Sequence, residues 1–137
     1  MHFSSSFMNH CLVLLSRLSI SFLMLTHGIP KLNKLLAGGE IKFADPLGLG
    51  PTLSLILVVF SEVICSLFIA MGFKSRLATI PLIITMLVAA FITHANDGLY
   101  KQEKALLYIV AYILIFITGS GRFSIDYLLE KNSKNKR

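Results

Sequence analysis

The stretch LVVFSEVICSLFIAMG, residues 57–72, consists of apolar side chains with a single carboxylate, Glu62, near its middle. It is the central part of a longer run, Thr52 to Met71, in which Glu62 is the one charged residue. A bilayer core accommodates about 20 consecutive apolar residues as a helix. The run therefore predicts a transmembrane helix that carries an acid inside it.

The rest of the chain has the same character. Hydrophobic residues make up 55% of the 137 positions without the nine glycines, whereas soluble domains reach about 45–50% with glycine included. Three further apolar segments carry at most one charged residue each: Cys11–Leu25, Leu77–Thr93 and Ala105–Thr118. We expect an all-α integral membrane four-helix bundle, formed by a single transmembrane domain over residues 1–137. The expected spans are residues 11–31, 52–71, 76–94 and 103–119, followed by a short amphipathic helix over residues 124–131.

The distribution of Lys and Arg predicts the orientation, because cytoplasmic loops are enriched in them. With four spans, seven of these residues fall on the side of both termini and five on the other side. We therefore expect a multi-pass protein of the cell (inner) membrane with cytoplasmic N- and C-termini. The net charge of +6 is interpreted as contact with the lipid bilayer and its anionic headgroups. No nucleic-acid partner is expected, since no aromatic and basic pattern of a nucleic-acid reader accompanies the charge.

The two cysteines, Cys11 and Cys65, fall inside predicted spans. Neither a CxxC pair nor a Cys/His spacing typical of metal sites is present, so we expect no metal site and no dithiol chemistry within the chain. Both are interpreted as small buried hydrophobic residues.

Glu62 lies about 14–15 Å from either end of its span, which is the bilayer midplane. An acid without a partner there costs about 2.5–3.5 kcal/mol, so Glu62 should face the bundle interior and have a partner. Arg17 is the one basic residue deep in another span, and its side chain can bridge a gap of several ångströms. We predict a guanidinium–carboxylate pair between Arg17 and Glu62. If these two residues do not meet, Lys31, His27 or a tyrosine of the fourth span is the next candidate.

Further polar side chains complete the candidate intramembrane polar site: His27, Lys31, His94, Tyr108 and Tyr112. The two histidines are placed near the outer ends of the first and third spans, and the tyrosines share one face of the fourth. Together they could supply hydrogen bonds or a proton path from the outer side. The alternative is structural: a buried ion pair can serve only to fix helix register, and interfacial His and Tyr are common without any function.

Glycine and proline mark the ends of the spans. Pro30 has no N–H to donate to the carbonyl of Thr26, so the first helix is expected to kink or end there. Gly72 is expected to stop the second helix. After the fourth span, the segment GSGRFSIDYLLEK begins with a glycine break, and Ser124 is a suitable N-cap with Asp126 in the first turn of a brief helix.

Three segments carry a resemblance to a known family: RLSISFLMLTHGIPKL, FSEVICSLFIAMGFKSRLA and EKALLYIVAYILIFITGSGRFSID. The last ends in a G-x-G-x-x-S-x-D pattern, matched by Gly119, Gly121, Ser124 and Asp126. From Arg17 to about Leu129 the chain resembles the DoxX family of small four-helix membrane proteins. Pro30 has no counterpart in the family pattern.

The resemblance implies a role in redox chemistry at the membrane. Members resemble the small subunit of a thiosulfate and quinone oxidoreductase, or belong to membrane complexes that manage thiol and oxidative stress. Quinone is therefore the candidate cofactor or partner, although no family motif assigns a bound cofactor to particular residues. The first hypothesis is a small membrane subunit of a quinone-linked or thiol- and sulfur-linked redox complex, with a soluble or membrane redox partner protein. The second is a non-catalytic membrane scaffold or anchor for a soluble partner enzyme.

Overall fold

The computed structural model describes residues 5–135 of the chain. Within this range the protein is helical throughout, apart from its turns and loops. The first long helix is α1 (Ser5–Leu36). The second is continuous but changes its winding, as α2 (Pro51–Val59), η1 (Phe60–Cys65) and α3 (Ser66–Met71). The third joins α4 (Ser75–Val88) to η2 (Ala89–Thr93), the fourth is α5 (Leu99–Thr118), and α6 (Ile125–Lys134) follows. Here η marks π-helical turns.

Three of these helical stretches are long and apolar enough to cross a membrane: Ser6–Leu36, Pro51–Met71 and Ser75–Thr93. Helix α5 is 20 residues long, but Lys101, Glu103 and Lys104 lie within its first six residues. The expected all-α membrane protein is confirmed. Lys136 and Arg137, which the charge count included, lie outside the described residues.

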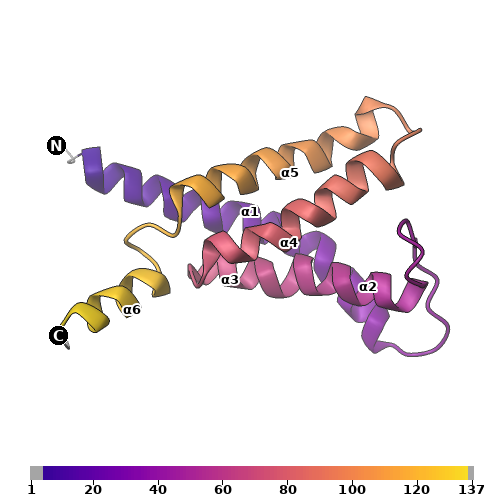
Figure 1. Cartoon of the computed structure of the whole chain (residues 1–137), viewed down its shortest axis with the longest axis horizontal. Helices are drawn as coiled ribbons and strands as arrows, with labels where there is room; N and C mark the ends of the chain where they lie inside the picture. Colours follow the sequence, from indigo (N-terminus) through magenta and orange to yellow (C-terminus); the bar gives the residue numbers. More distant parts are fainter. Residues whose placement is uncertain (1–4, 136–137) are drawn as a thin grey trace.

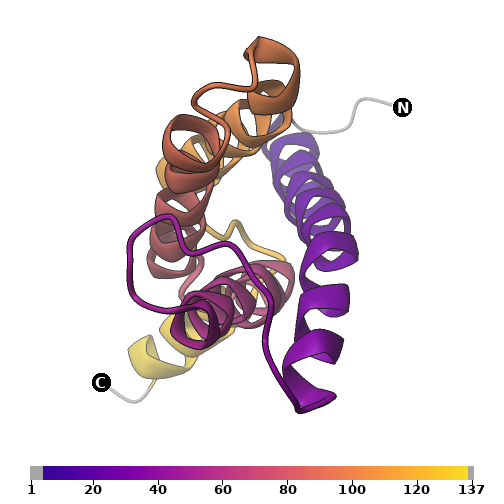
Figure 2. The same cartoon turned by 90° about the vertical axis from the view of Figure 1, so that its right-hand side faces the viewer.

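The long helices run antiparallel to one another in chain order. In Figure 1, α4 and α5 lie side by side as a hairpin, with α1 and the α2–α3 helix completing the bundle, and Figure 2 shows the same arrangement from one end. The turn between α3 and α4, the end of α5 and helix α6 lie at one end, which we call the motif end (Figure 1). The loop over residues 37–50 and the turn between η2 and α5 lie at the other, the loop end.

The core contains both apolar and polar side chains. Met24, Ile69, Leu82 and Tyr112 form its fully buried centre. Around the outside, many large apolar side chains are exposed, among them Phe22, Leu77, Leu107 and Ile117. Because a water-soluble protein rarely exposes large contiguous apolar patches, this surface is one that contacts the lipid bilayer.

Helix α1 does not end at Pro30, so that part of the expectation was wrong. The helix continues through Pro30 to Leu36. A proline inside a membrane helix is tolerated when neighbouring groups compensate for the lost hydrogen bond. Here the helix on both sides of Pro30 is held by packing: Leu25, Leu32 and Leu35 contact a core cluster on the second helix.

At the loop end, the side chain of Asp45 binds backbone and hydroxyl groups at the N-terminus of α2. Its carboxylate accepts hydrogen bonds from the backbone N–H of Leu49 and Gly50, both at 2.8 Å, and from the hydroxyl of Ser54 at 2.9 Å. These bonds, that from Gly50 first, hold the pKa of Asp45 below its usual value. The carboxylate thus satisfies donors at a helix N-terminus that would otherwise lack partners.

Candidate functional site

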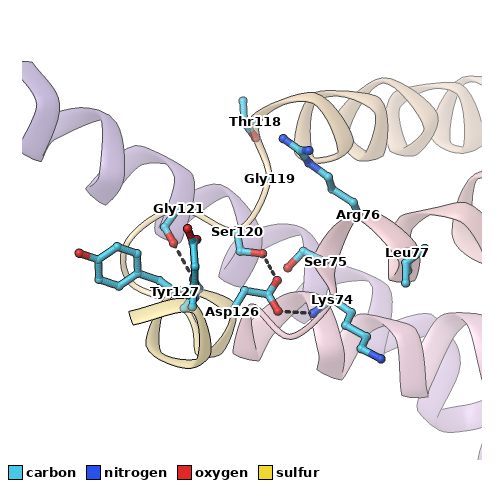
Figure 3. Close-up of a pocket in the computed structure, with 12 residues that line it drawn as sticks. Lys74, Ser75, Arg76, Leu77, Thr118, Gly119, Ser120, Gly121, Asp126 and Tyr127 are labelled. Atoms are coloured by element: carbon cyan, nitrogen blue, oxygen red, sulfur yellow. Dashed lines mark hydrogen bonds between the residues drawn. The ribbon is translucent and has the colours of Figure 1, made fainter. Parts of the chain in front are cut away.

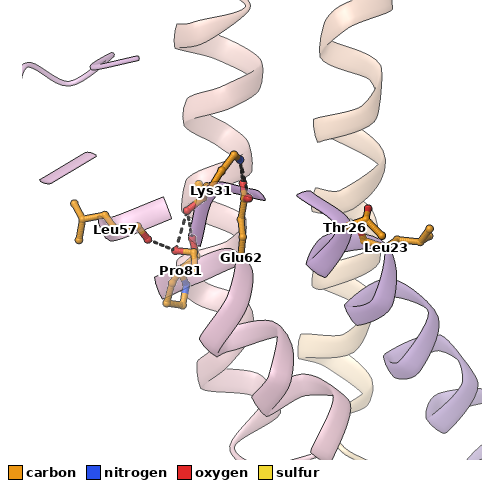
Figure 4. A network of polar contacts seen from close by, with 8 residues as sticks. Leu23, Thr26, Lys31, Leu57, Glu62 and Pro81 are labelled. Carbon is orange, nitrogen blue, oxygen red and sulfur yellow. Dashed lines mark hydrogen bonds and ion pairs between the residues drawn. The ribbon is translucent and has the colours of Figure 1, made fainter. Parts of the chain in front are cut away.

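The partner of Glu62 is Lys31. The ammonium nitrogen of Lys31 lies 2.6 Å from each of the two carboxylate oxygens of Glu62 (Figure 4). The Glu62 side chain is 3% exposed, whereas that of Lys31 is 30% exposed. The acid is therefore enclosed by the bundle, and its base connects it to the surface.

The pair forms because Gly28 lets two helices approach closely. A Cβ atom on Gly28 would lie 3.0 Å from the backbone carbonyl carbon and from the Cβ of Glu62, and 2.9 Å from a methyl group of Val63. Any larger residue would push α1 away from η1. Lys31 is three residues further along α1, so it lies on the same face as Gly28 and reaches the carboxylate.

Glu62 is held in a π-helical turn. Segment η1, Phe60–Cys65, interrupts the α-helix at the point where the acid enters the core. The hydroxyl of Ser61, in the same turn, lies 3.0 Å from that of Thr85 on α4 and donates to the carbonyl of Leu57 at 3.1 Å. Single π-helical turns of this kind are frequent at functional sites.

An aromatic stack lies next to the pair. The rings of Tyr108 and Tyr112 on α5 are stacked with centroids 6.0 Å apart, and His27 meets Tyr108 edge to face at 6.1 Å. His27 and both tyrosines lie within electrostatic range of the Glu62 carboxylate. The structure thus brings four of the predicted site residues around Glu62.

Three buried hydroxyl groups extend this polar region along the core. The hydroxyl of Ser21 has no hydrogen-bond partner among the residues that the structure describes, and the buried hydroxyls of Ser66 and Tyr112 lie close to one another. They come from α1, α3 and α5. Polar groups in an apolar interior cost free energy when they are not hydrogen-bonded, so their presence requires a reason.

The predicted pair of Arg17 and Glu62 is wrong. Glu62 packs beside Gly28, which is 11 residues from Arg17 along α1. At 1.5 Å per residue the separation is about 16 Å, which is beyond the reach of an arginine side chain. Spacing along one helix could not reveal this, because it does not show where the second helix crosses.

Arg17 instead binds backbone carbonyl groups at the motif end. Its guanidinium donates to the carbonyls of Ile69 and Ala70, both at 2.9 Å, and of Phe123 at 3.0 Å, and it also contacts that of Ser120. Ile69 and Ala70 belong to the last turn of α3, where carbonyl groups have no partner within the helix and carry partial negative charge. Arg17 therefore joins α1, α3 and the segment after α5.

His94 is separate from the Glu62 pair. Its ring nitrogen Nδ1 lies 2.8 Å from the carboxylate of Asp97, and Lys101 lies 3.6 Å from the same carboxylate. The hydrogen bond from His94 is the main reason that the pKa of Asp97 is lower than usual. His94 thus belongs to the exposed turn before α5, not to the mouth of the polar site.

The four motif residues form a structural junction. Ser124 caps α6 by accepting from the backbone N–H of Tyr127 at 3.2 Å, as predicted. Asp126 accepts from the N–H of Lys74 at 2.8 Å and from the hydroxyl of Ser120 at 2.5 Å, and its own N–H donates to the carbonyl of Gly72 at 3.0 Å. Gly119 and Gly121 both have positive φ, of 73° and 69°, which favours glycine in the turn before α6.

Gly72 is a second close approach, which the sequence alone did not reveal. It was expected only to stop the second helix. A Cβ atom on it would lie 2.4 Å from the Cβ of Ser124 and 2.8 Å from a terminal nitrogen of Arg17. Its φ of 69° also disfavours any other residue. Arg17, Gly72 and Ser124 thus meet at one point of the motif end.

A family model, described as DoxX, matches residues 12–95 of the chain. The chain belongs to the DoxX family. The match to DoxX includes Arg17, Lys31 and Glu62 and ends before the motif residues at 119–126. No curated protein matches the chain, and no solved structure does.

Among residues 5–135, no group of three or more His, Cys, Asp or Glu side chains is placed to hold a metal ion. Cys65 is buried and free, as expected, but Cys11 is exposed, so its interpretation as a buried residue was wrong. The chemistry that the site offers is proton exchange at a carboxylate, an ammonium group and two phenols.

Proposed function

We propose that this DoxX protein is a small membrane subunit of a redox complex, in which Glu62 and Lys31 exchange protons with a quinone headgroup or a small thiol or sulfur compound. The observation that carries the proposal is the pair itself. A carboxylate that is 3% exposed has an ammonium partner that is 30% exposed. Ionisable groups inside membrane segments are expensive and are typical of proton relays and substrate sites.

The electrons and protons that a quinone reaction consumes define the role proposed for this chain. Reduction of a quinone to a quinol takes up two electrons and two protons. In the proposal a partner subunit supplies the electrons, and the side chains around Glu62 supply the protons. Transfer of a proton from Lys31 to Glu62 makes both groups neutral. When Glu62 then gives that proton to the quinone, uptake of one proton by Lys31 restores the ion pair, and a second cycle delivers the second proton.

The aromatic and hydroxyl groups provide a continuation of the path. Tyr108 and Tyr112 stack beside the pair, and the buried hydroxyls of Ser66 and Tyr112 lie close to one another. Hydroxyl groups both donate and accept, which is what a proton relay requires.

We further propose four spans in the cell membrane, with α5 as the fourth. Lys101, Glu103 and Lys104 lie at its start, where long charged side chains can extend to the headgroups. Both termini would then be cytoplasmic. A cysteine at Asn132 should remain unlabelled by an impermeant reagent in intact cells. Labelling of this cysteine would show that the C-terminus lies outside the cell.

The variant Glu62→Gln tests the redox proposal. It keeps the size of the side chain and removes its proton exchange. Glu103→Gln is the matched control, because Glu103 is an exposed carboxylate of the same chain. In the complex purified with its partners, we expect Glu62→Gln to lose most quinone-linked turnover at normal protein level, while the control retains it. Equal turnover in both variants would refute the proposal.

The scaffold function remains the second candidate, and one observation favours it. The motif residues and Arg17 build a rigid junction at the motif end, next to helix α6, which has no buried residue between Ile125 and Lys134. A soluble partner could dock there. In that case Glu62→Gln would leave both complex assembly and activity unchanged, whereas disruption of the junction would release the partner.

A further inference from the structure

A cavity of about 440 Å³ opens at the motif end, between the start of α4, the end of α5 and helix α6 (Figure 3). Its walls include Ser75, Arg76 and Leu77 from α4, and Gly119, Ser120 and Asp126 from the motif segment. Gly72, just before it, is ten residues beyond Glu62, or about 15 Å along the helix. The cavity is therefore distinct from the Lys31–Glu62 pair, and a ligand bound in it would have a role beyond the proposed function.

The first turn of α4 forms part of the wall of this cavity. The first backbone bond of the helix is from the N–H of Ala78 to the carbonyl of Lys74, at 3.0 Å. The N–H groups of Ser75, Arg76 and Leu77 come before it, so helix geometry gives them no partner within α4. They also carry the partial positive charge of the helix N-terminus, which favours an anion.

A buried hydroxyl is a second, independent sign of a ligand. Ser75 is fully buried, and its hydroxyl has no partner among the residues that the structure describes. Ser75 also lines the cavity (Figure 3). Most buried hydroxyls in proteins are hydrogen-bonded, and an acceptor held in the cavity would satisfy this one.

The lining of the cavity carries two basic side chains, Lys74 and Arg76, and two acidic ones, Asp126 and Glu130. Its two acids are already engaged: Asp126 accepts from Lys74 N–H and from Ser120, and Glu130 is paired with Lys134 at 2.6 Å. The guanidinium of Arg76 has one long hydrogen bond, 3.3 Å, to the carbonyl of Ile117. Its remaining donors are available to a bound anion, whereas the ammonium group of Lys74 lies over the ring of Phe73, 5.6 Å from its centroid.

We propose that this cavity binds a phosphate group, held by the first-turn N–H groups of α4, the hydroxyl of Ser75 and the guanidinium of Arg76. The source that fits best is the headgroup of an anionic phospholipid. Leu77 and Ile117 border the site and are 61% and 65% exposed, so they offer an apolar surface to the acyl chains. Inorganic phosphate presents the same oxygens and is the alternative source.

The test uses the full chain in a neutral detergent, with phosphatidylglycerol, phosphatidylcholine and inorganic phosphate as probes. Thermal stability and lipid retention in native mass spectrometry are the two readouts. Phosphatidylglycerol should raise Tm and remain bound, whereas phosphatidylcholine should have a smaller effect. A Tm increase with inorganic phosphate that equals the lipid effect would retain the phosphate site and assign it to a soluble ligand.

Three variants distinguish lipid binding in this cavity from attraction of the lipid to general surface charge. Arg76→Gln should weaken phosphatidylglycerol binding about tenfold or more, as expected for a lost charged hydrogen bond. Lys131→Gln removes the same charge from α6 outside this cavity and should change binding little. Ser75→Ala should reduce the lipid effect without lowering Tm in its absence, because it removes a hydroxyl that has no described partner.

Two results would overturn the proposal. One is equal loss of binding in Arg76→Gln and Lys131→Gln, which would mean that only surface charge matters. The other is an unchanged lipid effect in Ser75→Ala, which would show that the buried hydroxyl does not face the ligand. The serine variant keeps the test valid if Arg76→Gln does not fold.

Discussion

Lys31 and Glu62 form an ion pair in which the two members are buried to very different extents. The ammonium nitrogen is 2.6 Å from both carboxylate oxygens, yet the side-chain exposures are 30% for the lysine and 3% for the acid. Loss of the base would leave a carboxylate in the core, whereas loss of the acid would leave an ammonium group that can extend toward the headgroups.

The two single substitutions should therefore have unequal effects. Lys31→Met leaves Glu62 buried and should lower the free energy of unfolding by about 3 kcal/mol, near the range for a broken buried pair. Glu62→Leu should lower it by less. The double variant should recover much of the loss. Unfolding of the protein in detergent would measure all three, and losses that simply add would show that the two side chains do not interact.

Arg17 should act independently of Glu62. Arg17→Met leaves the carbonyls of Ile69, Ala70 and Phe123 without their side-chain donor and should cost about 3 kcal/mol or more. Because the two sites are about 16 Å apart along α1, the double variant with Glu62→Leu should be additive within about 0.5 kcal/mol. A larger coupling energy in this cycle would mean that Arg17 and Glu62 share an interaction.

The two close-packed glycines should tolerate alanine to different degrees. In Gly28→Ala, overpacking against Glu62 costs about 1–3 kcal/mol, and a gain of roughly 1 kcal/mol in helix propensity offsets part of it. Gly72→Ala should cost more, because the new Cβ would lie 2.4 Å from that of Ser124 and the backbone of residue 72 is left-handed, with a φ of 69°. Gly38→Ala is the control: its φ is 72° but nothing lies within 4 Å, so only about 1–2 kcal/mol of backbone strain is expected.

The same measurement distinguishes the two close approaches from ordinary glycine turns. If Gly38→Ala were as damaging as Gly72→Ala, backbone conformation alone would explain the requirement for glycine. The packing of Arg17 and Ser124 against Gly72 would then have no energetic role.

Asp45 should make stability depend on acid pH. Its pKa is lower in the folded protein than in the unfolded chain, mainly because of the hydrogen bond from Gly50. The stabilisation is then complete above the unfolded pKa, and it is lost as pH falls through the folded pKa. Tm measured from about pH 6 downward should fall less steeply for Asp45→Asn than for the natural protein. Parallel curves would contradict the assignment.

The sequence predicted the fold well because membrane helices follow from the length of apolar runs. It also predicted Ser124 as an N-cap, since that signal is local. It did not identify the partner of Glu62, because the partner depends on which residues lie at the helix crossing. Gly28, one turn before Lys31, was the available signal, because a residue without a side chain lets a second helix approach closely.

The π-helical turn at Glu62 has no comparable signal. It inserts one residue into the winding of the second helix and so rotates every later side chain relative to a regular α-helix. If residues before and after η1 are assigned to one face of the second helix by a spacing of 3.6 residues, the residues after η1 are placed on the wrong side. The motif residues at 119–126 were identified by resemblance, but their role at the junction depends on Gly72 and Lys74, which are about 50 positions earlier in the chain.

Redox-induced infrared difference spectroscopy on the purified complex tests the central claim, that Glu62 exchanges protons during turnover. The account predicts a carboxyl band that changes between the oxidised and reduced states, is absent in Glu62→Gln and is retained in Glu103→Gln. A spectrum in which the carboxyl band persists unchanged in Glu62→Gln would contradict it, and the pair with Lys31 would then have only a structural role.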